Sequence, residues 1–287
     1  MTDGVFIVGA GRAGRGLSRA LRASGTDVIG LQGRRVELEP DVITAGPLPA
    51  SLAGATVVIV AVRDGQLDDA LGELAAAPLG TGAVVLHASG SADPRGLAAL
   101  RARGHPCGTF HPLVPLADPA RAAELLRGAW IGTDGDAAAI AAAERLAARL
   151  GAHVLRIPAG EKPAYHAAAV FASNFPTVLA AVAAQLLVRA GVAEGSAWGA
   201  IRALMRGAVA NLDDATPAQA LTGPIARGDV GTVRTHLAAL ESQPATRMLY
   251  ANLSLAAVEL ARVGAAASDS VSGEISRLLG EAAGNER

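Results

Sequence analysis

The sequence predicts an α/β chain of two parts: an N-terminal doubly wound domain over residues 1–158 and an all-α domain over residues 159–287. Two observations lead to this fold class. In the first part, short runs rich in β-branched residues alternate with helical stretches of alanine and leucine, as in a parallel sheet covered by helices. After residue 158 the β-branched runs stop, and only long helical patterns follow.

The chain begins with a strand, a glycine-rich turn and a helix. The apolar run 5–8 leads directly into G-x-G-x-x-G, and an amphipathic helix follows. Gly9 would permit the tight turn, Gly11 the approach of a pyrophosphate, and Gly14 the close packing of helix on strand. We interpret this unit as the dinucleotide site of a Rossmann domain, with the phosphates on the free N–H groups of the helix. The alternative is an ordinary βα turn. The predicted cofactor residues here are Gly9, Gly11, Arg12, Ala13 and Gly14.

The end of the second predicted strand indicates which dinucleotide is bound. An NAD site usually has an Asp or Glu there, about 20 residues after the glycines, to hold the ribose 2′-OH. In this chain the strand 28–31 is followed by Q-G-R-R, and Asp27 lies at the opposite end. Guanidinium groups match a 2′-phosphate in geometry and charge. We therefore predict NADP(H), bound by Arg34 and Arg35 with Arg12 within reach; the alternative is a solvated basic loop.

The remaining strands of the first domain should present loop residues to the cofactor at their carboxyl ends. The runs 57–62 and 83–86 are typical of buried parallel strands. Further short strands are expected at 109–111, 129–131 and 153–157, with a helix at 136–150. The loops after the first two of these runs add Val62, Arg63 and Ser89 to the predicted cofactor site, and Ser89 also to the substrate site.

Histidines lie close to the same predicted edge. His111 ends a strand in a loop fixed by Pro112 and Pro115, and we assign it to the catalytic site. His87 also ends a strand, but a structural role bonded to backbone is slightly favoured for it. No His, Cys or Asp spacing in the sequence resembles a metal site.

The first long helix, expected over 161–190, begins with the most polar segment of the second domain. Lys162, His166 and Ser173 follow helical spacing and share one face, with Asn174 beside it. Lys162 is the chain's single lysine, and a lysine, unlike an arginine, can lose its proton. The alternative is that Tyr165 and His166 only cap a domain interface.

Further helices are expected at 195–212, 230–240, 245–263 and 268–283. A turn-rich break at 220–229 separates two of them. Asp229 is a plausible N-cap for the helix that follows it. Thr222 and Arg227 in the same break are candidates for binding a substrate carboxylate.

Composition restricts the possible partners and location. The net charge of −1 offers nothing to nucleic acid or an anionic membrane. The one cysteine, Cys107, excludes an intramolecular disulfide and fits a reducing cytoplasm. Because the glycine loop starts at residue 9, we expect no secretory signal peptide. The apolar stretch 167–188 raises the question of a membrane span, but its polar interruptions favour a buried helix of a soluble protein.

Five motifs together carry a family resemblance: GAGRAG, HASGS, GTFHPLVPL, KPAYHAAAVFASNFP and LTGPIARGD. In this order the chain resembles Rossmann-like oxidoreductases with a C-terminal domain of unknown function. These are similar in architecture to ketopantoate reductase, pyrroline-5-carboxylate reductase and the 6-phosphogluconate dehydrogenase superfamily. Ketopantoate reductases carry a Lys followed by Asn four and eight residues later. Asn174 matches the last of these, while His166 and Val170 stand at the other two. Phe-His-Pro at His111 is similar to prephenate dehydrogenases, whose His faces the substrate.

The resemblance and the motifs predict an NADP(H)-dependent reductase of a small carbonyl or imine, with ketopantoate as one candidate substrate. His166 is the first choice for general acid and Lys162 the second, and Asn174 and Ser89 would position the substrate carbonyl. The alternative is a non-catalytic NADP(H) sensor. A helical domain this rich in alanine and leucine is also expected to form a two-fold homodimer, unless those residues only fill the core of one subunit.

Overall fold

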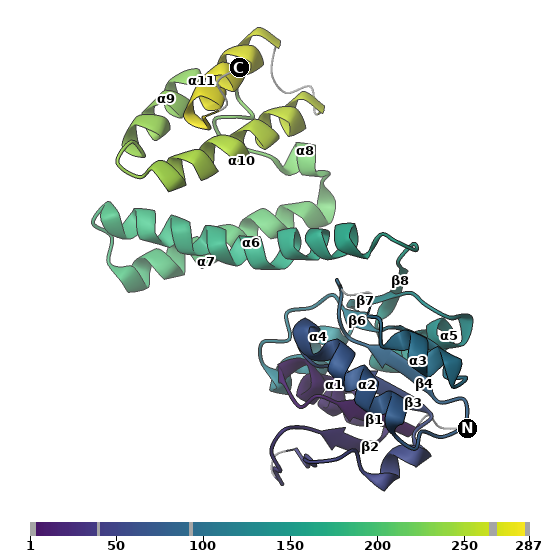
Figure 1. Ribbon diagram of the computed structural model, residues 1–287. Helices are drawn as coiled ribbons and strands as arrows, with labels where there is room; N and C mark the ends of the chain where they lie inside the picture. Colours follow the sequence, from purple (N-terminus) through teal and green to yellow (C-terminus); the bar gives the residue numbers. More distant parts are fainter. Residues whose placement is uncertain (1–3, 39–40, 92–93, 264–268, 285–287) are drawn as a thin grey trace. The chain divides into compact units, whose positions relative to one another are not determined.

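The computed structural model describes residues 4–38, 41–91, 94–263 and 269–284. It divides into two compact units, Met1–Phe175 and Pro176–Arg287, shown in Figure 1. Unit 1 contains all the strands named below, and unit 2 contains helices. The division falls inside one long helix, so the first turns of that helix belong to unit 1.

Unit 1 is built on a five-stranded parallel sheet in the order β2-β1-β3-β4-β5. Side chains of successive β1 residues enter two separate cores, because neighbouring strand residues point to opposite faces. Val5 and Ile7 pack on one face with α1 and α5, and Phe6 and Val8 on the other with α2 and α3. The strands are β1 Gly4–Val8, β2 Asp27–Gln32, β3 Val57–Val60, β4 Val84–His87 and β5 Cys107–Thr109. The covering helices are α1 Arg12–Ala23, α2 Leu67–Ala76, α3 Leu97–Ala102 and α5 Ala137–Leu150.

At the outer edge of the five-stranded sheet, Gln32 of β2 forms a parallel bridge with Thr44. If Thr44 is counted as a reduced strand, the order becomes that of a six-stranded Rossmann sheet, 3-2-1-4-5-6. The segment between β2 and the short helix η1 Ala50–Gly54 therefore stands where a crossover helix would be expected. The predicted Rossmann-like class of this domain is confirmed.

A second, smaller sheet of unit 1 has the order β6-β7-β8. It consists of β6 His111–Pro112, β7 Trp130–Thr133 and β8 His153–Arg156. The predicted single strand 109–111 is wrong, because the chain changes sheets at the buried Phe110. The Phe110 N–H still bonds the carbonyl of His87, whereas His111 already pairs with β7. This break gives His111 its position. The remaining short elements of unit 1 are η2 Asp64–Gln66, η3 Pro119–Arg121 and α4 Ala122–Leu126.

Unit 2 is all-α, as predicted. Its buried core includes Val233, Leu237, Val258, Ile275 and Leu279. The Asp229 side chain accepts bonds from the N–H and hydroxyl of Thr232, so its predicted role as N-cap is confirmed. The helices are α6 Lys162–Arg189, which begins in unit 1, then α7 Glu194–Asp214, α8 Pro217–Ala220, α9 Val230–Ala239, α10 Pro244–Val263 and α11 Asp269–Ala282.

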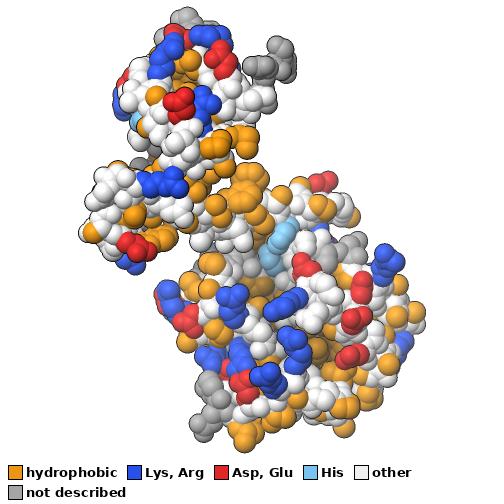
Figure 2. All heavy atoms as spheres, turned by 60° about the vertical axis from the view of Figure 1, so that its left-hand side comes forward, with side chains coloured by type: hydrophobic (Ala, Val, Ile, Leu, Met, Phe, Trp, Pro, Cys, Tyr) orange, Lys and Arg blue, Asp and Glu red, His pale blue; other side chains and the backbone are white. Residues whose placement is uncertain are grey.

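Helix α6 is not the buried helix that the sequence favoured. Among the described residues it is the one helix long and apolar enough to cross a membrane, yet only 6% of that apolar window is buried. Phe171 is 68% exposed, and Val178 is exposed as well. Pro176 lies inside α6 without ending it. Figure 2 shows many hydrophobic side chains on the surface of the helical part. The prediction failed because the apolar composition of a helix favours its burial but does not identify the surface against which the helix packs.

Candidate functional site

The glycine loop joins β1 to α1 with room on its outer side. Gly9 has a φ of 110°, and a Cβ there would strike the carbonyl of Ala61. A Cβ at Gly14 would overlap the carbonyl of Gly9. A Cβ at Gly11 would instead meet nothing within 4 Å, and no side chain caps the helix that begins after it. This leaves N–H groups of α1 open to a ligand, which fits a pyrophosphate.

The predicted 2′-phosphate residues lie at the same edge of the sheet. Val8 pairs in register with Gln32, so β1 and β2 end side by side. Arg34 and Arg35 follow β2, Arg12 begins α1, and all three side chains are exposed. No hydrogen bond or ion pair joins them to another described residue. Basic side chains gather on the face of unit 1 seen in Figure 2. These guanidinium groups are therefore available to an anion.

The loops after β3 and β4 lie beside the glycine loop. A Cβ at Gly9 would be 3.0 Å from Cγ1 of Val62, which places Val62 against the turn. Arg63 is exposed and Ser89 is buried. The Ser91 hydroxyl donates to Asp64 at 2.9 Å and so links the two loops. The predicted cofactor residues of unit 1 thus follow neighbouring strand ends, while their roles stay predictions.

Two histidines far apart in the sequence meet in unit 1. The ring centroids of His111 and His166 are 6.0 Å apart, with the rings at 63°. Nδ1 of His111 is hydrogen-bonded to the Tyr165 hydroxyl at 2.7 Å. A Cβ at Gly90 would lie 2.7 Å from the His111 ring and 2.8 Å from Nδ1 of His166, so the absent side chain lets both rings reach the β4 loop. We call His111, Tyr165 and His166 the histidine cluster.

Burial sets the charge state of two members of the histidine cluster, His111 and Tyr165. Burial, followed by the charge of the neighbouring His166, lowers the pKa of His111 to about 4. Burial also raises the pKa of Tyr165, so both groups are neutral near pH 7. When the phenol donates to Nδ1, the proton of the neutral His111 ring lies on Nε2. Nδ1 of His166 is buried and has no hydrogen-bond partner among the described residues. An unpartnered buried polar atom requires an explanation, and a catalytic role is one of those known from other proteins.

Lys162 lies in a separate buried group. It is 5% exposed, and its Nζ is 3.1 Å from Oδ2 of Asp134, directly after β7. Nζ is also 3.5 Å from Nε2 of His87, which in turn lies 3.2 Å from the Thr109 hydroxyl. Burial, followed by the charge of Lys162, lowers the pKa of His87 to about 4. Lys162 thus has a carboxylate partner, and His87 joins β4 to β5 through Thr109.

No described contact within unit 1 joins the other predicted catalytic and substrate residues to the histidine cluster. Asn174 is exposed on α6, eight residues after His166. Thr222 and Arg227 lie in unit 2, between α8 and α9. Their roles stay predictions. Within the described ranges no three His, Cys, Asp or Glu side chains are grouped to hold a metal ion.

Three participants were missed from the sequence. The sequence indicates only an interface role for Tyr165, although this residue directly precedes His166. Asp134 follows a strand, and the rule that polar residues gather at strand ends would have selected it had β7 been extended to Thr133. Gly90 gave no signal, because its importance depends on two rings that approach it from other elements.

Comparison with known proteins agrees with this architecture. Residues 129–257 match the family model of a domain of unknown function, DUF2520. This segment starts at the small sheet of unit 1 and ends within α10. No curated protein matches the sequence.

Solved structures share the fold over most of the chain. BF3122 from Bacteroides fragilis, named as an inferred NADP oxidoreductase, is 21% identical, with a TM-score of 0.71 over 90% of this chain and 98% of that one. TM1727 from Thermotoga maritima is 24% identical, with a TM-score of 0.69 over 91% and 99%. A pyrroline-5-carboxylate reductase from Coxiella burnetii is 18% identical, with a TM-score of 0.58 over 91% and 98%. The resemblance drawn from the five motifs is therefore confirmed at the level of the fold and the C-terminal domain.

Proposed function

We propose that this protein is an NADP(H)-dependent reductase acting on a small carbonyl or imine substrate that carries a carboxylate. The observation that carries the proposal is the combination of two features of unit 1. An open glycine loop is flanked by exposed Arg34 and Arg35, and the histidine cluster lies against Gly90 in the loop that follows β4. The similar pyrroline-5-carboxylate reductase supports it, since its named substrate contains a C=N bond and a carboxylate.

The chain's own residues have distinct tasks in cofactor binding. The N–H groups at the start of α1 bind the pyrophosphate, and Gly11 leaves the space for it. Arg34 and Arg35, with Arg12, bind the 2′-phosphate through charge-assisted hydrogen bonds. NADPH, when bound, supplies the hydride. The protein then has to orient the substrate and deliver one proton.

His166 is the proposed proton donor. Its Nδ1 has no partner among the described residues, whereas Lys162 is already ion-paired to Asp134. His111, neutral and hydrogen-bonded to Tyr165, fixes the edge of the site next to His166. Reduction forms one C–H bond, and the proton from His166 completes the O–H or N–H of the product. Lys162 is the second candidate donor.

The proposed substrate contacts follow the same chemistry. Ser89 and Asn174 can each donate a hydrogen bond to a carbonyl oxygen or imine nitrogen. Thr222 and Arg227 offer a hydroxyl and a guanidinium for a carboxylate. Ketopantoate is one specific candidate, supported by the position of Asn174 relative to His166.

The proposal is tested by oxidation of NADPH in the presence of 2-oxo acids and of cyclic imines that carry a carboxylate. We expect turnover with at least one member of these two classes, and loss of it in His166→Ala. Tight binding of NADPH with no turnover of either class would contradict the enzyme and favour a non-catalytic NADP(H) sensor. Equal affinity for NADH and NADPH would contradict the assignment of Arg34 and Arg35.

We also propose a homodimer formed through α6 and α7. Beyond Phe171, apolar side chains on both helices are exposed, with Leu204 at 70%. A second copy of this chain could bury these apolar side chains without any other protein, and two-fold dimers are the most frequent closed assembly. Sedimentation at micromolar concentration should give twice the chain mass of 28.7 kDa. A mass of 28.7 kDa would contradict the dimer.

A cytoplasmic location is proposed on the chemistry of Cys107. The thiol is buried, and burial raises its pKa to about 11, so it stays a thiol rather than a reactive thiolate. Cell fractionation tests the location. Recovery of the protein in the membrane pellet would contradict it and draw attention to the exposed α6.

A further inference from the structure

The segment that carries Arg34 and Arg35 is fastened at its base. Gly33 N–H bonds the Thr44 carbonyl at 2.8 Å, and Thr44 N–H bonds the Leu31 carbonyl at 3.0 Å. The Gln32 side chain accepts from the Thr44 hydroxyl at 2.6 Å and donates to the Gly46 carbonyl at 2.7 Å. The backbone directly before Arg34 and Arg35 is therefore held in place at the end of β2.

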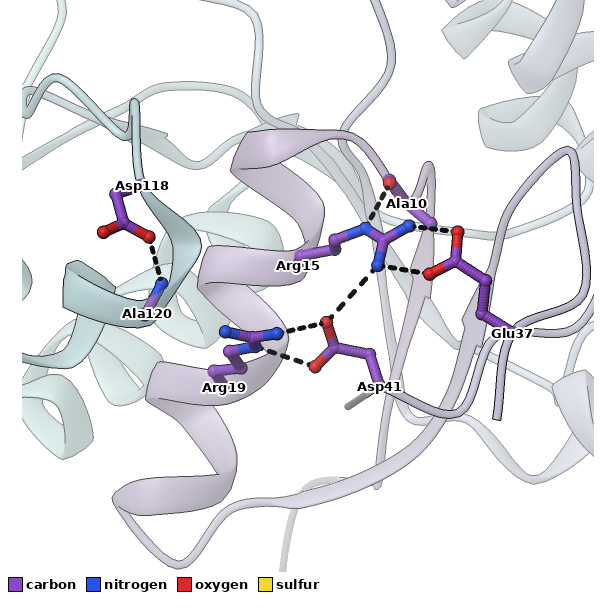
Figure 3. A network of polar contacts seen from close by, with 7 residues as sticks. All are labelled: Ala10, Arg15, Arg19, Glu37, Asp41, Asp118 and Ala120. Carbon is purple, nitrogen blue, oxygen red and sulfur yellow. Dashed lines mark hydrogen bonds and ion pairs between the residues drawn. The ribbon is translucent and has the colours of Figure 1, made fainter. Parts of the chain in front are cut away.

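The same segment is tied to α1 by Arg15. Its Nη1 and Nη2 donate to the two carboxylate oxygens of Glu37 at 2.7 and 2.6 Å, as Figure 3 shows. Its Nε donates to the carbonyl of Ala10 at 3.0 Å. Because Ala10 lies inside the glycine loop, one guanidinium joins the predicted pyrophosphate loop to the predicted 2′-phosphate loop.

A second pair holds the far side of the segment. Arg19 makes two bonds of 2.8 and 2.9 Å to Asp41, which is 8% exposed. Nη1 of Arg15 lies 3.7 Å from Oδ2 of Asp41, so the two pairs are in contact (Figure 3). Glu37 also forms a backbone bridge with Ile43, two residues after Asp41 in the sequence. We call Arg15, Arg19, Glu37 and Asp41 the α1 clasp.

The α1 clasp contains two positive and two negative side chains, so its formal charge is zero. Three donor nitrogens of Arg15 are used within the protein, which removes it from the set of phosphate ligands. Glu37 is the nearest carboxylate after β2, and both of its oxygens accept from Arg15. Glu37 is therefore already occupied, whereas the acidic residue of an NAD site near this position accepts a hydrogen bond from the ribose 2′-OH. The exposed Arg12, Arg34 and Arg35 keep their charge for a ligand.

We propose that the α1 clasp sets the preference for NADP(H) over NAD(H), by holding Arg34 and Arg35 in register with the glycine loop and by neutralising Glu37. Its members are positioning residues, and the inference rests on the proposed function. The clasp thus extends cofactor selection from the arginines that touch the 2′-phosphate to four residues that do not. Charge-assisted, bidentate bonds suit this task, because they fix direction as well as distance.

The test compares the dissociation constants of NADPH and NADH, measured by nicotinamide fluorescence, in the full chain and in single and combined variants. Arg15→Met removes both ties and leaves Glu37 charged beside the expected phosphate. Glu37→Gln keeps the shape and removes the charge. Glu124→Gln is the matched control, since Glu124 forms a similar pair with Arg121 on the exterior of the same unit.

We expect Arg15→Met to lower the NADPH-over-NADH preference about tenfold, by analogy with groups that orient the ligands of a metal. Glu37→Gln should lower the preference less, and Glu124→Gln should leave it unchanged. Combining Arg15→Met with Glu37→Gln should restore part of the preference, because no carboxylate then stands unpaired. A merely structural role would lower the affinity for both cofactors alike and show no such recovery.

Two outcomes overturn the inference while leaving the proposed function intact. In the first outcome, the NADPH-over-NADH preference of Arg15→Met stays within about twofold of the parent, while the Arg34→Ala, Arg35→Ala double variant abolishes the preference. In the second outcome, Arg15→Met weakens the binding of NADPH and of NADH equally. If the parent shows no preference, or the double arginine variant keeps it, the proposed 2′-phosphate site itself is wrong. Should Arg15→Met not fold, Asp41→Asn, which weakens the Arg19 pair and the contact of Asp41 with Arg15, is judged by the same ratio and the same limits.

Discussion

The two halves of the candidate site in unit 1 differ in how far their ionisable side chains are exposed to solvent. At the glycine-loop edge, permanent charges are exposed or paired with each other, and Arg12, Arg34 and Arg35 face solvent. In the histidine cluster, burial favours the neutral forms of His111 and Tyr165. A phosphate requires a fixed positive charge, whereas proton transfer requires groups whose charge can change. The difference indicates that affinity and turnover can be altered separately.

The largest expected effect separates turnover from affinity. His166→Ala removes the proposed donor and should lower kcat by about 10²- to 10⁴-fold while the dissociation constant for NADPH stays unchanged. His153→Ala is the matched control, because His153 is exposed and stacks on Trp130 outside the cluster. Lys162→Arg keeps a positive charge but removes a titratable amine. Full loss of kcat in Lys162→Arg, with His166→Ala active, would reverse the ranking of the two donors.

The second prediction concerns pH and the buried imidazoles. His111 and His87 have a pKa of about 4 in the fold against 6.5 as the reference value. The unfolded chain therefore binds more protons between these values, so the stabilisation is complete above about pH 6.5 and is lost as the pH falls toward 4. Each histidine should cost about 3 kcal/mol of unfolding free energy over this range. Urea unfolding at a series of pH values measures it.

The control for that measurement is His111→Gln, which removes one titrating ring. Its unfolding free energy should fall less steeply below pH 6.5 than that of the parent. An unchanged slope would mean that His111 is protonated alike in the folded and unfolded chain, and would contradict the neutral state of the His111 ring.

The third prediction tests the open side of the glycine loop. Gly11→Ala adds a methyl group that the protein itself accommodates, since nothing lies within 4 Å of it. A bound pyrophosphate would meet this methyl, and a steric cost of about 1–3 kcal/mol should weaken the binding of both NADPH and NADH about fivefold to 150-fold. Gly72→Ala, on the exposed side of α2, also meets nothing and is the matched control. Unaltered affinities in Gly11→Ala would place the dinucleotide elsewhere.

The sequence predicted the features that depend on local patterns. The strand, glycine turn and helix at the N-terminus, and the long helices after residue 158, follow from periodicity that neighbouring residues carry. His111 and His166 were both selected, because each lies at an informative position of its own element. Their proximity was not predictable, since it depends on the change of sheets at Phe110.

Charge partners were harder to predict than elements. Lys162 attracted attention as the single lysine, but its ion pair with Asp134 brings together α6 and the end of β7. The pair of Arg15 with Glu37 was missed for the same reason, although both residues lie close to the predicted cofactor loop. The exposure of α6 was predicted wrongly, because hydropathy reports the apolar character of a helix and not its neighbours.

The smallest expected effect distinguishes the two halves by their response to salt. Ions screen exposed charges with a Debye length of about 10 Å at 0.1 M and about 3 Å at 1 M, while sheltered groups are screened much less. NADPH affinity should therefore fall a few-fold as NaCl rises between these concentrations, and NADH affinity should fall less because it lacks the 2′-phosphate. The Arg34→Ala, Arg35→Ala variant should remove the difference between the two cofactors. The titration of His111, followed by NMR of its ring, should keep its midpoint over the same range, because Tyr165 and Gly90 shield the ring. A salt-dependent midpoint for His111, or equal salt dependence of NADPH and NADH in the parent, would show that the two halves do not differ in charge exposure as the structure indicates.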